Sequence, residues 1–404
     1  KLLHDKFGNE QIILHGICIG AAGSMYALTS ENCKYVTREA YLFVDKSDLK
    51  IASKADAVKE WHTIEFDVLD VSDGTRIYLR DENVNNGTHG IYVDSIEARQ
   101  IGKWVRKTST LRVLLWNIQN GMWADQHNNY DNFVAWAKRW DADVCVWCES
   151  ETIYKDKTNT ATSSKYLPDG WGELCKRYGH TYFAVGGNRD NYPQTVTSKY
   201  PIEVVQRITN TNVSGKPIAH GAGHFTITVN GKKINIVTMH MWPQAYGNGV
   251  PSSEQEASKA KNEGDLYREF EVQYIVDNTL KNTKYANEEY WLIGGDTNAT
   301  SRLDKWHYGY EDNSTKFLVH DIFLNQTDMK DVIGHRYPNC FMASTMSGRR
   351  IDIMYASPAM YRMLDNSMTL LDYWTASTAK SVYYSSFYDP SDHLPVLMDF
   401  DLSK

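Results

Sequence analysis

The chain has 404 residues, 42% of them hydrophobic, so it can bury a sizeable core and is long enough for two domains. A formal net charge of -7 excludes a general electrostatic attraction to phosphate backbones, so any contact with nucleic acid needs a local basic patch. Six cysteines are too sparse for a disulfide scaffold. Cys145 and Cys148 lie in a strand-like run, which favours buried thiols over a redox motif.

The longest apolar run, residues 12–28, contains His15, Ser24 and several glycines, and it predicts a buried strand with turns rather than a membrane span. The sequence does not begin with Met, which a removed signal peptide or a trimmed boundary would explain. Short β-like runs broken by turns then continue to residue 101 and predict an all-β domain over residues 1–106, with a sandwich or jelly-roll arrangement.

The strand "YVDSIEA" around Asp94 resembles the closing strand of carbohydrate-binding jelly-roll modules, so a glycan is a candidate ligand of this domain. An inert structural domain is the alternative. Together with the acidic net charge, a glycan module favours a secreted or periplasmic protein over a cytoplasmic one. Residues 102–110, "GKWVRKTST", are expected to link this domain to a second one over residues 107–404.

Beyond the linker, apolar strands alternate with helical stretches, which predicts layers of helix and sheet with mixed sheets. Phe133, Trp136, Ala137 and Trp140 recur at helical spacing, and Asn230-Gly231 joins two strands as a hairpin. A long polar helix is expected over about residues 254–281. Further strands are predicted in "LRVLLWNI", "DVCVWCE", "YWLIGGD", "RRIDIMYAS" and "HLPVLMDFDL".

Polar residues follow or interrupt these apolar strands one after another, at the sheet edges where functional sites are built. They are Asn117, Glu149, His240, Asp296, Asn298, Asp352 in the middle of its strand, and the pair Asp392 and His393.

Their types agree on phosphoester hydrolysis. The carboxylates of Glu149 and Asp392 suit Mg²⁺, a hard cation that takes one or two protein carboxylates and keeps several waters. The amide and imidazole groups of Asn117, Asn298 and His240 can stabilise developing negative charge. A carboxylate beside a histidine, as expected for Asp352 and His393, defines the tautomer and charge of the ring.

Six blocks in this order, "LLWNIQ", "DVCVWCE", "VTMH", "GGDTN", "RRIDIMY" and "SDHLPV", resemble the motifs of the endonuclease/exonuclease/phosphatase superfamily of metal-dependent phosphodiesterases and phosphatases. "VTSKYPI" is a seventh match. The resemblance spans most of residues 111–400 and implies an α+β fold, a four-layer α/β/β/α sandwich with two packed mixed sheets.

Residue by residue, the resemblance implies that Glu149 is the principal Mg²⁺ ligand, with Asn117 beside it. Asp296 would position or deprotonate the attacking water, and Asn298 would bind the phosphoryl group. The remaining roles fall to three residues: His240 would assist the leaving oxygen, and Asp352 would orient His393. Whether Asp296 or His393 is the base stays open.

The sequence therefore predicts a Mg²⁺-dependent hydrolase, with Mn²⁺ as a substitute, that cleaves a phosphodiester by in-line attack of an activated water. Its substrate could be nucleic acid or a small or lipid phosphodiester. The alternative is a non-catalytic glycan-binding protein in which the large domain is a scaffold.

Overall fold

The structure is a computed structural model. It describes residues 106–404, apart from 155–160, 167–169, 190, 210–215, 339–340 and 371–389. Before residue 106 it describes the backbone of six strands, which are β1 (Gln11–Gly20), β2 (Ala40–Val44), β3 (Lys50–Ser53), β4 (His62–Val68), β5 (Ile77–Asp81) and β6 (Ile91–Gly102).

Two compact units make up the chain. One consists of Lys1–Thr108, Trp306–Gly309 and Tyr337–Ala343, and the other of Ser109–Lys305, Tyr310–Arg336 and Ser344–Lys404. The grouping therefore adds two late segments to the N-terminal region, which no local sequence pattern indicates. The division into residues 1–106 and 107–404 stays a prediction.

The first unit holds two antiparallel sheets, with strand orders β4-β1-β6 and β18-β3-β2-β5. Its strand β18 (Phe341–Met342) pairs with β3 although some 290 residues separate them, as Phe341 lies opposite Ala52. The side chains of β1–β6 lie outside the described residues, Asp94 among them, so the predicted glycan site is untested.

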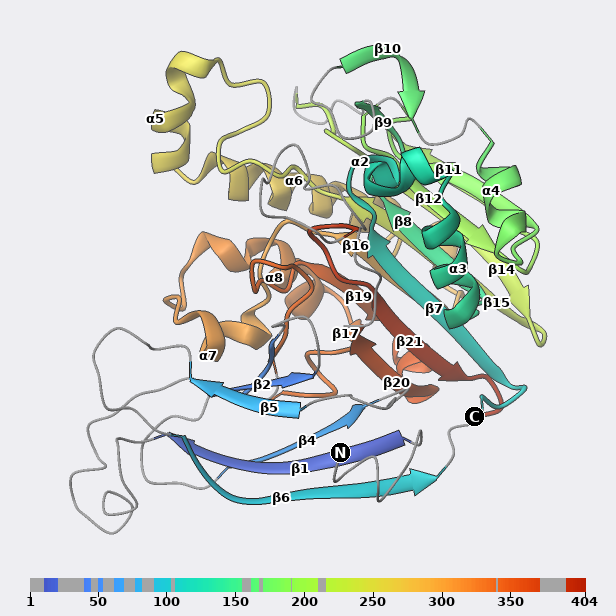
Figure 1. Cartoon of the computed structure of the whole chain (residues 1–404). Helices are drawn as coiled ribbons and strands as arrows, with labels where there is room; N and C mark the ends of the chain where they lie inside the picture. The colour runs from blue at the N-terminus through green and yellow to red at the C-terminus, as the bar shows by residue number, and fades with distance from the viewer. Residues whose placement is uncertain are drawn as a thin grey trace. The chain divides into compact units, whose positions relative to one another are not determined.

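The second unit is built around two six-stranded sheets (Figure 1). The first, here called the β7 sheet, has the order β11-β12-β8-β7-β21-β20. Its strands are β11 (Tyr182–Gly186), β12 (Gln194–Ser198), β8 (Val144–Cys148), β7 (Thr110–Asn117), β21 (Val396–Asp401) and β20 (Leu364–Thr369). Only β7 and β8 run parallel, so the sheet is mixed.

The second sheet, here called the β16 sheet, has the order β13-β14-β15-β16-β19-β17. Its strands are β13 (Glu203–Ile208), β14 (Ala222–Val229), β15 (Lys232–His240), β16 (Tyr290–Asp296), β19 (Asp352–Ala356) and β17 (Lys330–Asp331). It too is mixed, because β15 and β16 run parallel. Asn230 and Gly231, with φ of 51° and 76°, form the predicted hairpin turn between β14 and β15.

The two sheets pack face to face, and helices cover their outer faces. Between them the Gly186 and Gly223 backbones lie in contact, and Thr238 Oγ1 donates to Gln194 Oε1 at 3.4 Å. Helix α3 (Asp131–Trp140) covers the β7 sheet, with the Phe133 and Trp147 rings 5.0 Å apart, a pair worth about 0.5–1.5 kcal/mol beyond its burial. This arrangement confirms the predicted four-layer sandwich.

Helices α6 (Glu263–Asn278) and α8 (Leu318–Gln326) cover the β16 sheet, where Val272 and Phe323 share an apolar core with Met239, Ile293 and Ile353. The predicted polar helix is present but broken: α5 (Gln255–Ala260) ends before Asn262, whose φ of 56° is left-handed. The other helices are α2 (Gln119–Met122), α4 (Trp171–Arg177), α7 (Lys305–Tyr308), α9 (Pro358–Arg362) and the 3-10 turns η4 (Trp123–Asn128), η5 (Ser252–Glu254), η6 (Thr283–Tyr285), η7 (Arg302–Asp304) and η8 (Thr315–Phe317).

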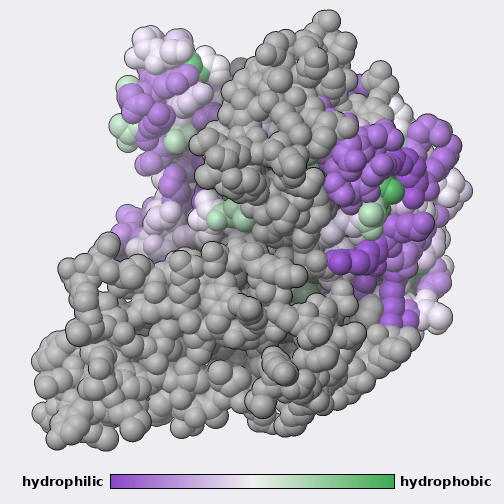
Figure 2. Space-filling view, viewed as in Figure 1, coloured by the Kyte–Doolittle hydropathy of each residue, from purple (hydrophilic) through white to green (hydrophobic). Residues whose placement is uncertain are grey.

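A short hairpin, β9 (Thr152–Tyr154) with β10 (Ala161–Tyr166), completes the strands. On the face drawn in Figure 2 the described surface is mostly hydrophilic, and its apolar residues are scattered. In the part of the chain that the structure describes, no helix has the length and hydropathy needed to cross a bilayer.

Candidate active site

Strand register brings three of the predicted residues together. His240 ends β15 directly beside Asp296, which ends the parallel strand β16, and Asp352 opposes Asp296 from the antiparallel strand β19. Side chains alternate between the two faces of a strand, and their preceding or following neighbours Met239 and Ile353 point into the core under α6 and α8. The three polar side chains therefore point to the opposite face, between the sheets.

Asp352 is the first residue of β19, so its predicted position in the middle of the strand is wrong. The segment before it does not extend the ladder, because Arg350 is buried in an ion-pair cluster with Asp304 and Asp331. Removing one partner of such a buried cluster typically costs about 3–5 kcal/mol. The cluster thus fixes the entry to β19 and the place where Asp352 emerges.

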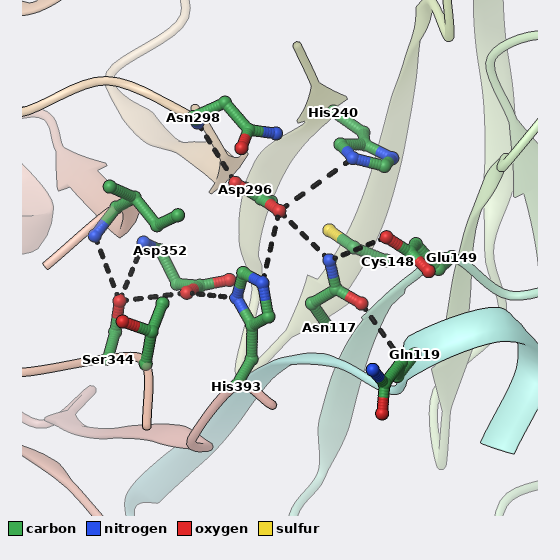
Figure 3. A network of polar contacts seen from close by, with 12 residues as sticks. Asn117, Gln119, Cys148, Glu149, His240, Asp296, Asn298, Ser344, Asp352 and His393 are labelled. Carbon is green, nitrogen blue, oxygen red and sulfur yellow. Dashed lines mark hydrogen bonds and ion pairs between the residues drawn. The ribbon is translucent and has the colours of Figure 1, made fainter. Parts of the chain in front are cut away.

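Asp296 lies at the centre of the site (Figure 3). Its Oδ2 accepts a hydrogen bond from Asn117 Nδ2 at 2.9 Å, across from the β7 sheet. The same oxygen lies 3.7 Å from Nε2 of His240 and 3.7 Å from Nε2 of His393. Those separations are too long for hydrogen bonds, so both Nε2 atoms lie near the carboxylate without being hydrogen-bonded to it.

His393 and Asp352 form the predicted pair. The Nδ1 atom of His393 donates to Asp352 Oδ2 at 2.7 Å, and Ser344 Oγ donates to the same oxygen at 2.8 Å. Burial alone would lower the pKa of His393, but the Asp352 and Asp296 carboxylates outweigh it and hold that pKa well above its usual value. Burial raises the pKa of Asp352 to about 6 although His393 pulls it down. At neutral pH His393 is therefore a charged imidazolium and Asp352 a carboxylate, and the two form an ion pair.

The other histidine, His240, has a different orientation. Its Nδ1 lies 3.2 Å from the carbonyl oxygen of Tyr192, and a carbonyl only accepts, so Nδ1 carries a proton. In the neutral ring Nε2 is then the free acceptor that faces Asp296. The ring stacks on His220 at 4.4 Å between centroids, which fixes its plane.

Glu149 directly follows β8, and Asn117 lies between Glu149 and Asp296. Its Oε1 accepts from Asn117 Nδ2 at 3.3 Å and its Oε2 from the Asn120 backbone N–H at 2.8 Å. That amide belongs to an unusual turn, because all four residues 119–122 have φ between 45° and 65°. Left-handed backbone costs roughly 1–2 kcal/mol for each non-glycine residue, so the turn is strained.

Asn298 is held by the loop after β16. Its backbone N–H donates to Asp296 Oδ1 at 2.9 Å, and its side-chain Nδ2 donates to the Met241 carbonyl at 3.1 Å. Its φ of 49° is also left-handed. The carboxamide is half-buried and tied to the strand end that carries His240.

Negative charge accumulates in this site. Burial raises the pKa of Asp392, and the nearby Glu149 and Asp296 carboxylates raise it further, against His393. Among the described residues no Lys or Arg forms an ion pair with these carboxylates or with Asp352. Asp352 Oδ1 is buried with no hydrogen-bond partner. This donor set fits a divalent cation, because hard cations are bound by oxygen ligands.

Two sets of residues could hold such an ion. The sequence assigned it to Glu149 and Asp392. A second set is Asp296, Asp352 and His393, whose ligand atoms lie within 4.8 Å of one another, and its histidine could bind an ion only after the ring has lost a proton. The residue roles inferred from sequence remain predictions.

The neighbouring thiols offer no nucleophile. Cys148 is buried and donates to the Met239 carbonyl at 3.6 Å, and burial, then Asp296, raise the pKa of its thiol well above the usual value. Cys145 is also a buried free thiol with a raised pKa. A thiolate is the reactive form of cysteine, so covalent catalysis by these residues is disfavoured.

Sequence reasoning missed Ser344, Tyr192 and His220. Ser344 bonds Asp352 across a turn, and Tyr192 contributes only its carbonyl, which no side-chain motif encodes. The sequence marks His220 only by its position shortly before the predicted hairpin that ends at His240.

Several solved structures are similar to this chain over 72% of its length. An AP endonuclease from Archaeoglobus fulgidus matches with 15% identity and a TM-score of 0.47 over 99% of that chain. A 3′-5′ exonuclease from Neisseria meningitidis matches with 15% identity and a TM-score of 0.45 over 99% of its length. An endonuclease/exonuclease/phosphatase from Beutenbergia cavernae matches with 16% identity and a TM-score of 0.45 over 72% of its length.

The chain is thus similar to structures of the endonuclease/exonuclease/phosphatase type. No protein-family model and no curated protein matches it. With TM-scores below 0.5, none of these likenesses carries a function over to this chain.

Proposed function

We propose that this chain is a divalent-cation-dependent hydrolase of phosphoester bonds, with phosphodiesters as its main substrates. One observation carries the proposal: Asp296 Oδ2 is surrounded by an amide donor and two imidazole Nε2 atoms from three other strands or loops. A carboxylate for the attacking water and a donor for the phosphate oxygens are what in-line hydrolysis requires, and Asp296 and the His393 imidazolium can supply them.

The charge state of His393 favours one division of roles. An imidazolium held by Asp352 has no lone pair for a proton, so His393 donates to the phosphate and Asp296 accepts the proton of the water. The carboxamide of Asn298 would contact the phosphoryl oxygens. His240 would contact the leaving oxygen as an imidazolium, with Nε2 protonated as the donor because Nδ1 is held by the Tyr192 carbonyl. An assembled set of this kind also argues against a silent scaffold with glycan binding alone.

Glu149 and Asp392 would hold the cation, with Asn117 oriented between Glu149 and Asp296. Mg²⁺ is the proposed ion and Mn²⁺ its substitute, because the ligands are carboxylates and amides rather than thiolates. When bound, the ion would neutralise charge on the phosphate oxygens.

An assay panel tests the proposal: plasmid DNA, RNA, bis-p-nitrophenyl phosphate, p-nitrophenyl phosphate and sphingomyelin, each with Mg²⁺ and with excess EDTA. We expect EDTA-sensitive hydrolysis of at least one diester, abolished in Asp296→Asn. The exposed substitution Asp328→Asn is the matched control. Absence of hydrolysis from the whole panel, or hydrolysis unchanged in Asp296→Asn, would overturn the proposal.

A secreted or periplasmic location, and a glycan as ligand of residues 1–106, remain proposals that rest on the sequence alone. Fractionation of cells that express the protein from its own gene addresses the first. A glycan array probed with the full chain addresses the second.

A further inference from the structure

Helix α6 carries a fully buried acid, Glu271, in a position that no sequence motif marks. Its Oε1 accepts the backbone N–H of Ala219 at 2.7 Å and its Oε2 accepts the backbone N–H of Trp242 at 2.9 Å. Burial raises the pKa of this carboxyl to about 7, although the two N–H groups and Arg268 lower it. A buried ionisable group is costly, and here both of its oxygens are used to hold backbone.

The same face of α6 holds the segment that follows His240. Arg268, one turn before Glu271, donates to the carbonyls of Trp242 at 2.8 Å and Gln244 at 3.0 Å. One turn earlier, the Gly264 N–H donates to the Ala245 carbonyl at 3.1 Å. Residues spaced three and four apart share a helix face, so successive turns of α6 are hydrogen-bonded to the segment that follows His240.

The peptide group between Met241 and Trp242 connects Glu271 to the active site. Its N–H is the one bound by Glu271, and its carbonyl is the acceptor of Asn298 Nδ2 at 3.1 Å. No peptide bond among the described residues is cis, so the N–H and C=O of this planar group point in opposite directions. Fixing the N–H on the helix side therefore fixes the carbonyl on the Asn298 side.

The other carboxylate oxygen of Glu271, Oε1, binds the Ala219 N–H beside His220. Ala219 directly precedes His220, whose ring stacks on His240 with centroids 4.4 Å apart and planes at 22°. One carboxylate thus holds the backbone next to His220 and next to the partner of Asn298.

We propose that Glu271 is a positioning residue of the site: through the 241–242 peptide it sets the orientation of the Asn298 carboxamide, and through Ala219 it supports the His220–His240 stack. The role in turnover rests on the proposed function. The structural coupling of Glu271 to Asn298 does not.

A double-mutant cycle tests the coupling in turnover. Glu271→Gln keeps the shape but replaces one acceptor oxygen by an NH₂ group, which cannot accept from a backbone N–H. We expect kcat on the diester substrate to fall roughly 10- to 100-fold with little change in KM, as for other supporting residues around a site. In an Asn298→Ala background the same substitution should cost less than about 3-fold. Glu269→Gln on the same helix is the control.

Equal losses from Glu271→Gln with and without Asn298 would show that the two residues act independently and would overturn the proposal. A loss of the same size in Glu269→Gln would do so too, because it would reveal a general effect on α6. Thermal unfolding of each variant separates either result from misfolding.

Amide hydrogen exchange provides a readout that needs no activity. In the wild-type protein the Trp242 and Ala219 amides should exchange slowly although both lie outside strands and helices, and both should exchange faster in Glu271→Gln. Fast exchange at Trp242 in the wild type would overturn the inference even if Glu271→Gln does not fold. If the wild type hydrolyses nothing in the panel but this exchange pattern is found, the proposed function fails and the coupling of Glu271 to the 241–242 peptide stands.

Discussion

The two sides of the site are built differently. On one side Glu149 is partly exposed, has a left-handed φ of 52°, and binds the amide of a turn whose four residues are all left-handed. On the other side Asp352 is buried in β19 and pairs with His393 and Ser344. The first side combines an accessible carboxylate with a strained backbone, and the second combines a buried charge pair with regular sheet.

The difference separates two tasks. An accessible carboxylate can exchange its partners for an incoming ion. A buried ion pair keeps its charges and geometry, because a low dielectric strengthens the attraction between its members. We therefore expect Glu149 to govern cation binding and Asp352 to govern the charge of His393.

Asp352→Asn should have the largest effect. We expect turnover to fall roughly 10³- to 10⁴-fold, as when the carboxylate that orients a catalytic histidine is removed elsewhere. The pKa of His393 is raised by Asp352, so its loss lowers that pKa. As the pH rises, the ring of His393 then loses its charge at a lower pH than in the wild type. The basic limb of the pH–rate profile should therefore move to lower pH.

Movement of the acidic limb instead would mean that the neutral ring of His393 is the active form, and the base assignment would pass from Asp296 to His393. Wild-type turnover with an unmoved profile would show that the pair is not functionally coupled. Asp328→Asn, an exposed change of the same kind, should leave both limbs in place.

Glu149→Gln should have the next largest effect. It keeps the side-chain shape but removes the charge, so we expect Mg²⁺ affinity and turnover to fall together by roughly 10²- to 10³-fold. Isothermal titration with Mg²⁺ and a cation titration of the rate measure the two. The exposed Glu254→Gln provides the control.

If Asp352→Asn weakens Mg²⁺ binding more than Glu149→Gln does, the ion belongs to the set of Asp296, Asp352 and His393 instead. The two substitutions together therefore assign the cation to one side of the site.

Gly121→Ala should have the smallest effect. Gly121 has a φ of 65°, where alanine costs about 1–2 kcal/mol, and its N–H donates to the Glu149 carbonyl at 2.7 Å. We expect the free energy of unfolding to drop by about 1 kcal/mol, with a several-fold weaker Mg²⁺ affinity.

The matched control is Gly231→Ala in the β14–β15 hairpin. Gly231 has a φ of 76° and open space where a Cβ would lie, so its replacement carries similar strain far from Glu149. Urea unfolding should show similar losses for both variants, whereas only Gly121→Ala should weaken Mg²⁺ binding. Equal Mg²⁺ affinities of Gly121→Ala and Gly231→Ala would mean that the left-handed turn does not shape the Glu149 site.

Local sequence determined the elements of the second unit. A continuous apolar run, as in β7, reports a strand that is buried on both faces, and apolar residues at helical spacing, as Phe133 and Trp136, report burial of one helix face. Both signals act within a few residues. The Asn230-Gly231 turn is equally local, because glycine and asparagine tolerate left-handed backbone. The chemical types at the strand ends were readable for the same reason.

Only the tertiary structure decided how those residues meet. Asp296 and Asn117 are 179 residues apart and come from different sheets, so their contact depends on the register and packing of both. The same holds for Glu271, one acid among many on a polar helix until the fold places it against two backbone N–H groups. A residue's type is fixed by the sequence, but its partners are set by long-range register, burial and the left-handed backbone that packing stabilises.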